Sequence, residues 1–178
     1  MEKIYFVTGN EGKLKEAREI LKTEIEAISI DLPEIQALEV LDVVKDKAQR
    51  AYNEIKKPVL IEDTGVYIKD WNNFPGALIK WMMKTVDCEG IVKMIEPFEN
   101  KDAYAETVLC YYDGEKFNIF NGKIEGKIVS PRGKNGFGWD PIFEVEKNSK
   151  TFAEMTDDEK NSISMRKIAF EKLREFLK

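Results

Sequence analysis

The stretch FVTGNEGKLKEA, Phe6 to Ala17, decides how the chain begins to fold. An apolar run leads into Thr-Gly-Asn, and an amphipathic pattern follows directly after it. This order predicts a buried strand over residues 3–8 and a helix over residues 12–22. The inward face of that helix is expected to consist of Leu14, Ala17, the stem of Arg18 and Leu21.

The turn between this strand and this helix matches a phosphate-binding loop only in part. The usual pattern has four residues between its glycines and a Ser or Thr after the lysine. Here two residues separate Gly9 from Gly12, and neither Ser nor Thr follows Lys13. Backbone N–H groups at the start of a helix still attract anions. We therefore expect either an anion-binding loop, helped by Thr8, Asn10 and Lys13, or a structural turn with Asn10 near the N-cap.

The remaining pattern alternates strands and helices at first and then becomes rich in strands. Predicted strands cover residues 24–30, 59–62, 66–68, 103–112, 116–120 and 122–128. Predicted helices cover residues 41–55, 77–84 and 89–95, and a last helix after a capping box at residues 156–159 runs to residue 178. This order predicts an α/β fold in which helices flank a mixed sheet, and residues 1–178 are expected to form a single domain.

The composition limits the chemistry that the chain can perform. It has 178 residues, a net charge of −5 and no histidine, so a general base must be Asp, Glu, Lys, Tyr or Cys. The acidic charge argues against a general nucleic-acid binder, and an anionic ligand would need a locally positive pocket. Two cysteines without metal-ligand spacing favour a reduced, cytoplasmic setting, and no apolar run is long enough to span a membrane.

Two acidic residues follow a predicted buried strand in LIEDTG, residues 60–65. A strand that ends there would deliver carboxylates to the edge of the sheet at which ligands commonly bind. Adjacent strand residues point to opposite faces, so we expect Asp63 to face a pocket and Glu62 to be salt-bridged or supporting. Glu34, in the turn DLPEIQ, is a candidate second oxygen ligand for Mg²⁺. The alternatives are a structural Asp-Thr-Gly turn and an exposed turn carboxylate.

The segment PRGKNGFGWDP, residues 131–141, combines cationic, aromatic and glycine residues in a predicted loop. Phe137 and Trp139 alternate with glycines, which would let a flat ligand approach the backbone, and Asp140 follows. Aromatic faces stack on bases, and a carboxylate can accept a base N–H. The segment therefore indicates a base-binding loop or, alternatively, a glycine-rich hairpin whose aromatic side chains lie in the core.

Two cationic residues, Lys160 and Arg166, lie near the start of the last predicted helix. Six residues apart, they would not share one helical face. They converge only if the continuous helix begins near residue 161 or 162. Otherwise they belong to a solvated basic surface.

Seven segments together resemble one known family, the inosine triphosphate pyrophosphatases. In chain order they are FVTGNEGKL, DLPEIQ, VLIEDTG, FPGALIKW, GFGWDPIF, TFAEMTDDEKN and SMR. The resemblance covers nearly the whole chain and implies an elongated α/β fold, with two lobes and a substrate cleft between them, and a homodimer. It also implies Mg²⁺-dependent hydrolysis of ITP, dITP and XTP to the nucleoside monophosphate and pyrophosphate. The alternatives are a purine nucleotide-binding regulator without turnover and a different nucleotide hydrolase or phosphotransferase.

The resemblance also implies roles for individual residues. Asp63 would be catalytic, as the proton acceptor, and would hold magnesium together with Glu34. The implied substrate contacts are Thr8, Gly9, Asn10, Lys13, Thr64, Lys80, Phe137, Gly138, Trp139, Asp140, Lys160, Met165 and Arg166, with residues 137–140 around the base.

The sequence departs from the family pattern at one position. Met165 stands where the family has a histidine between Ser and Arg, and methionine is a poor hydrogen-bonding partner. The base would then be read more loosely, or by Arg166 and backbone groups. A lysine that the family has in the helix after DLPEIQ corresponds here to either Lys45 or Lys47.

Overall fold

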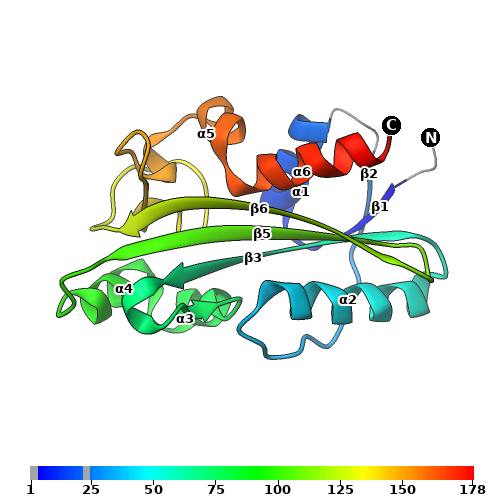
Figure 1. Ribbon diagram of the computed structural model, residues 1–178, viewed down its shortest axis with the longest axis horizontal. Helices are drawn as coiled ribbons and strands as arrows, with labels where there is room; N and C mark the ends of the chain where they lie inside the picture. Colours follow the sequence, from blue (N-terminus) through cyan, green and yellow to red (C-terminus); the bar gives the residue numbers. More distant parts are fainter. Residues whose placement is uncertain (1–3, 22–24) are drawn as a thin grey trace.

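The computed structural model describes residues 4–21 and 25–178, and within these ranges the chain forms one sheet of seven strands (Figure 1). The strands are β1 (Ile4–Val7), β2 (Ile25–Ile28), β3 (Val59–Ile68), β4 (Phe74–Gly76), β5 (Asp102–Tyr112), β6 (Phe117–Ile128) and β7 (Phe143–Val145). Their order is β2-β1-β3-β5-β6-β7, with β4 beside part of β3. The sheet is mixed because β1 is parallel to β2 and β3, whereas β5 is antiparallel to β3.

Helices cover both faces of this sheet (Figure 1). They are α1 (Glu11–Leu21), α2 (Val40–Ile55), α3 (Ile79–Thr85), α4 (Asp87–Ile95), α5 (Asp157–Ile163) and α6 (Met165–Phe176). One face carries α2, α3 and α4, and the other carries α1, α5 and α6. The predicted α/β class, a mixed sheet flanked by helices, is thus confirmed, whereas the two lobes and the single domain stay predictions. Residues 3, 22 and 24, at the ends of three predicted elements, lie outside the described residues.

Strand β3 differs from its prediction. The sequence indicated a break after Glu62, but the strand is continuous because β5 pairs with it at all ten positions. On the opposite edge, β1 pairs only with Val59 and Leu60, and β4 pairs only with residues 66–68. In the described part of the chain, residues 61–65 therefore have no strand partner on that edge. The strand that ends beside Glu62 and Asp63 is therefore β1, whereas β3 continues past both residues.

The last predicted helix is in fact two helices. α5 begins after the predicted capping box, in which the Thr156 side chain accepts a bond from the Glu159 N–H. α6 begins after Ser164, whose side chain accepts a bond from the Lys167 N–H. The prediction of one unbroken helix from the capping box to residue 178 was wrong, because Ser164, a second capping residue, breaks the helix. No continuous helix begins near residue 161 or 162, which the sequence had made the condition for Lys160 and Arg166 to converge. For β6 the prediction erred in the other direction. The two strands predicted over residues 116–120 and 122–128 form one continuous strand, which pairs with β5.

Helix α1 turns an unexpected residue inward. Its buried residues are Glu16, Ala17, Ile20 and Leu21. Arg18 is exposed, so its predicted inward stem was wrong. α1 and α6 pack together over the sheet, where Phe6 of β1 meets Phe170 of α6 edge to face with ring centroids 6.3 Å apart. This packing fixes the carboxylate of Glu16 beside the first turn of α6.

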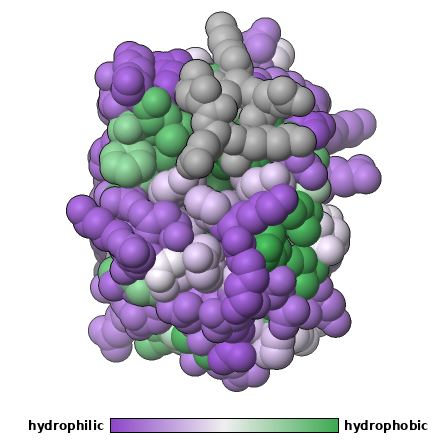
Figure 2. All heavy atoms as spheres, turned by 90° about the vertical axis from the view of Figure 1, so that its right-hand side faces the viewer, coloured by the Kyte–Doolittle hydropathy of each residue, from purple (hydrophilic) through white to green (hydrophobic). Residues whose placement is uncertain are grey.

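The end of the molecule that carries the C-terminus and the β5–β6 turn is largely hydrophilic. Apolar atoms form separate small areas on the part of this face that the described residues make up (Figure 2). No helix in the described part of the chain has the length and apolar character that a membrane crossing requires.

Candidate functional site: a cavity at the gap between β1 and β4

A cavity of about 560 Å³ lies where β1 ends and leaves residues 61–65 of β3 without a strand neighbour. Its wall comes from the β1–α1 turn, the β2–α2 loop that carries Glu34, β3, α2, α3, the loop before residue 141 and the α5–α6 break. Every residue predicted to bind substrate or metal lines this cavity. The structure therefore brings the predicted residues together, and their roles stay predictions.

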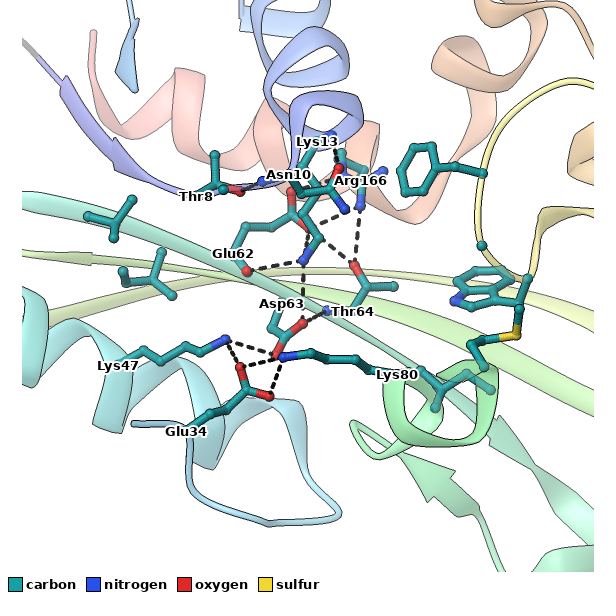
Figure 3. Close-up of a pocket in the computed structure, with 18 of the residues that line it drawn as sticks. Thr8, Asn10, Lys13, Glu34, Lys47, Glu62, Asp63, Thr64, Lys80 and Arg166 are labelled. Atoms are coloured by element: carbon teal, nitrogen blue, oxygen red, sulfur yellow. Dashed lines mark hydrogen bonds and ion pairs between the residues drawn. The ribbon is translucent and has the colours of Figure 1, made fainter. Parts of the chain in front are cut away.

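The β1–α1 turn is held by its own side chains. The Asn10 N–H donates to Thr8 Oγ1 at 3.1 Å, and Asn10 Oδ1 accepts from the Lys13 N–H at 3.0 Å. Asn10 thus stands close to the helix N-terminus, as the structural alternative required. The same turn directs the start of α1 toward the cavity (Figure 3), so the structural and anion-binding interpretations are compatible.

Glu62 and Asp63 both line the cavity, although they point to opposite faces of β3. Thr64 Oγ1 donates to Glu62 Oε1 at 3.2 Å, as expected for alternate residues on one face, and Asp63 lies on the side of Glu34 (Figure 3). The prediction that only one carboxylate could face the pocket was wrong, because the open edge of β3 gives the cavity access to both faces.

Glu62 is salt-bridged, as predicted. Its carboxylate accepts two bonds from Arg166, from Nε to Oε2 at 2.9 Å and from Nη2 to Oε1 at 3.0 Å. Burial raises the pKa of Glu62, but Arg166 and Lys13 outweigh burial and bring the pKa to about 2. The side chain therefore stays ionised, and its negative charge stabilises the positive charges of Arg166 and Lys13.

Lys13 connects the two carboxylates. Its Nζ lies 3.4 Å from Asp63 Oδ1 and 3.4 Å from Glu62 Oε1. Burial lowers the pKa of Lys13, but these two carboxylates outweigh burial and the net pKa is raised. The ammonium group is therefore charged and can bind an anion.

Glu16 extends the charged cluster and was missed by the sequence reasoning. Its carboxylate contacts Arg166 Nη1, and Lys160 Nζ lies 2.9 Å from its Oε1. Lys160 Nζ also lies 2.7 Å from Asp140 Oδ2, which accepts the Phe137 N–H at 2.8 Å. The break at Ser164 thus lets Lys160 and Arg166 share one carboxylate. The available signal was the position of Glu16 three residues after Lys13, on the same side of α1.

Below β3, Glu34 and Asp63 converge on one lysine (Figure 3). Lys47 Nζ contacts Glu34 Oε2 and lies 3.7 Å from Asp63 Oδ2. Lys80 Nζ lies 3.3 Å from Glu34 Oε1. Burial raises the pKa of Glu34, but Lys47 and Lys80 outweigh burial and the net pKa lies below the ordinary value. Of the two lysines left open by the sequence, Lys47 lines the cavity.

These two carboxylates offer part of a coordination sphere. The described residues contain no group of three or more His, Cys, Asp or Glu side chains suited to a metal ion. Mg²⁺ commonly takes one or two carboxylates and completes its shell with water and phosphate oxygens. The position of the Lys47 ammonium between Glu34 and Asp63 indicates that both oxygens can face one cation. The residues therefore fit Mg²⁺ in the presence of a phosphate ligand.

The opposite end of the cavity is aromatic. Trp139 packs against Phe143 and Phe152, with centroids 5.5 Å and 6.1 Å apart, so the core alternative holds for this ring. Phe137 is 37% exposed, and Lys160 Nζ lies 4.7 Å from its ring centroid. Met165 lines the cavity but is only 1% exposed. A flat aromatic group at this end of the cavity would contact Phe137 and Met165.

The charge of the lining differs from that of the whole chain. Its cationic residues are Lys13, Lys47, Lys80, Lys84, Lys160 and Arg166, and its acidic residues are Asp31, Glu34, Glu62, Asp63 and Asp140. Cations thus outnumber carboxylates in the lining, whereas the chain carries a net charge of −5. The excess is one charge, and Glu16, outside the lining, pairs with Lys160 and Arg166. An anion would therefore bind by replacing carboxylate partners of the lysines.

The chain is similar over nearly its whole length to known proteins. The inosine triphosphate pyrophosphatase of Schizosaccharomyces pombe is 42% identical over 181 residues, which cover 99% of this chain and 96% of that protein. The corresponding protein of Saccharomyces cerevisiae is 42% identical, with 98% and 95% covered. A solved HAM1 protein from Coxiella burnetii is 30% identical with a TM-score of 0.89, and the match covers 99% of this chain and 98% of that one. The model of the Ham1 family matches residues 4–176, and the chain belongs to this family.

Proposed function

We propose that the protein hydrolyses non-standard purine nucleoside triphosphates, such as ITP, dITP and XTP, to the monophosphate and pyrophosphate, and so removes them from the nucleotide pool. The relatives named inosine triphosphate pyrophosphatase support this activity, since they match over nearly the whole chain. The observation that carries the proposal is the position of Asp63. It lies between Lys13 and Lys47, in a cavity with an aromatic far end.

The cationic end of the cavity would hold the triphosphate. Lys13, Lys47 and Lys80 each contact a carboxylate, and phosphate oxygens would replace these partners on binding. The N-terminal N–H groups of α1 would add fixed positive ends of dipoles. Together these groups would neutralise the triphosphate within an acidic protein.

Glu34 and Asp63 would hold Mg²⁺, with water and substrate oxygens as the other ligands. When bound, Mg²⁺ would offset the negative charge that grows on the bridging oxygen between the α- and β-phosphates. This assignment is part of the proposal and rests on the two convergent carboxylates.

Asp63 would also act as the general base. A water oxygen attacks the α-phosphorus, its proton passes to the Asp63 carboxylate, and the bond to the bridging oxygen breaks to release pyrophosphate. Lys13 Nζ contacts the Asp63 carboxylate, and its backbone N–H is bonded to Asn10 of the β1–α1 turn, so its charge could balance negative charge on the leaving group.

The aromatic end would receive the base. Inosine and xanthine carry a 6-oxo group and an N1–H, whereas adenine carries a 6-amino group and a bare N1. A site that pairs with the oxopurine pattern would leave buried groups unpaired with adenine, which can give roughly 10⁴-fold rejection. Met165 would pack on the base without reading it, so selectivity would rest on Arg166 and on backbone groups of residues 137–140.

The direct test is incubation of ITP with the protein and Mg²⁺, followed by product analysis with and without inorganic pyrophosphatase. We expect inosine monophosphate and pyrophosphate in equal amounts. Inosine diphosphate as the main product would contradict cleavage between the α- and β-phosphates. Binding of ITP without any product would favour the regulator alternative.

We also propose that the protein is a cytoplasmic homodimer. Cys88 and Cys110 are free thiols, which suits a reducing compartment. Light scattering coupled to size-exclusion chromatography would test the dimer, for which a mass near the 20.6 kDa of one chain would be the contradicting result.

A further inference from the structure

Phe137 borders two hollows. One is the cavity described above, and the other is a groove of about 440 Å³ between α1 and the loop around Gly136. The groove is lined in part by Gly12 and Glu16 of α1. Any movement of the Phe137 ring therefore changes the shape of the cavity at the end that would receive the base.

The backbone of Phe137 is fixed from the side of Asp140. The Phe137 N–H donates to Asp140 Oδ2 at 2.8 Å. Gly136 has φ +73°, and a Cβ there would lie 2.1 Å from the same oxygen, so only glycine allows this approach. These contacts fix where the loop lies, but they do not fix the direction of the aromatic ring.

The ring is fixed from the side of α1. A Cβ built on Gly12 would lie 2.8 Å from Phe137 Cε1 and 2.9 Å from Cδ1, which is closer than a Cβ can approach. On the same ring, Lys160 Nζ lies 4.7 Å from the centroid and Arg166 Cζ lies 5.9 Å from it. The ring thus occupies the space that any side chain at position 12 would need.

Other reasons for the glycine are weaker. A Cβ at position 12 would lie 3.2 Å from Asn10 Oδ1, which is a tight contact but a longer one than those to the Phe137 ring. Gly12 lies within helix α1 and lacks the positive φ that would exclude other residues. Alanine is a better helix former than glycine, so a glycine here weakens the helix. The Phe137 ring makes the closest contacts and is therefore the main reason for glycine at this position.

We propose that Gly12 is a positioning residue that determines, through Phe137, the width of the base end of the cavity. Gly12 itself would not touch the base. The stacking of a purine on Phe137 rests on the proposed function, whereas the coupling of Gly12 to Phe137 does not. The two parts can therefore be tested separately.

The first test is a thermal double-mutant cycle without ligand. Gly12→Ala is expected to leave Tm unchanged or lower it in the wild-type chain, and to raise it by about 2 °C in a Phe137→Ala chain. Arg18→Ala, an exposed position on the same helix, is the control and should shift Tm equally in both chains. An equal increase for Gly12→Ala in both chains would overturn the proposal.

The second test separates the base from the phosphates. Gly12→Ala is expected to raise KM for ITP at least about threefold, while inhibition by inorganic tripolyphosphate stays unchanged. In the Phe137→Ala chain, Gly12→Ala should have no further effect on KM. An equal loss of tripolyphosphate affinity would overturn the proposal, because Gly12 would then act on the phosphate-binding turn. Lack of ITP turnover in the wild-type protein would contradict the proposed function but leave the thermal cycle valid.

Discussion

Lys13 Nζ lies 3.4 Å from Asp63 Oδ1, although 50 residues separate the two in sequence. The contact forms because β1 stops after Val7, so that the first turn of α1 lies over the open edge of β3. The lysine proposed to bind phosphate and the carboxylate proposed to deprotonate water are therefore adjacent. The proposed hydrolysis depends on this pair.

Asp63→Asn should abolish turnover while the nucleotide still binds. The amide keeps the shape of the side chain but cannot accept the proton, so we expect kcat for ITP to fall about 10²–10⁴-fold. The measurement is kcat beside ITP affinity from calorimetry. Asp70→Asn, at an exposed position, is the matched control and should behave as wild type. Full activity of Asp63→Asn would remove this residue from the mechanism.

Lys47→Ala should weaken substrate binding. Lys47 contacts Glu34 and lies 3.7 Å from Asp63, so its charge would meet the bound triphosphate. We expect KM for ITP to rise about tenfold, as for the loss of a hydrogen bond between charged groups. Lys45→Ala, two residues away and outside the cavity lining, should change KM little. Equal effects of the two variants would contradict the assignment of Lys47.

Met165→His should change which base is preferred. Methionine offers only packing, whereas histidine adds a hydrogen-bonding group at the base end of the cavity. We expect the ratio of kcat/KM for ITP and GTP to change more than kcat for ITP. A thermal melt should accompany the assay because Met165 is only 1% exposed. An unaltered ratio in a folded variant would mean that position 165 does not face the base.

Acid should destabilise the protein through Glu62. The pKa of this residue falls from 4.5 to about 2 on folding, so between these values the unfolded chain binds more protons than the folded one. Stability is then present above about pH 4.5 and is lost as the pH falls toward 2. Urea unfolding at a series of pH values should show a shallower loss for Glu62→Gln than for wild type. Equal slopes would contradict this role of Glu62.

Local signals were sufficient for part of the fold. The apolar periodicity of α2 and the capping box at Thr156 act within one or two helical turns, and both elements appear where the sequence indicated them. The course of β3 was mispredicted because β5, whose residues lie some 40 positions later, holds the Asp-Thr-Gly segment in an extended strand. A single sequence window does not contain that partner.

The candidate site shows the same limit. Every site residue that the motifs indicated lines the cavity, but no motif indicated Glu16. Its burial depends on Lys160 and Arg166, which lie 144 and 150 residues away. A lone glutamate on a helix is normally exposed, and only the convergence of two cations makes its burial favourable.

The most direct test of the account is hydrolysis of ITP in water enriched in ¹⁸O, with Mg²⁺ present and the products separated for mass spectrometry. Attack of an Asp63-bound water on the α-phosphorus predicts one labelled oxygen in inosine monophosphate and none in pyrophosphate. Label in the pyrophosphate would place the attack on the β-phosphorus and contradict the proposed mechanism.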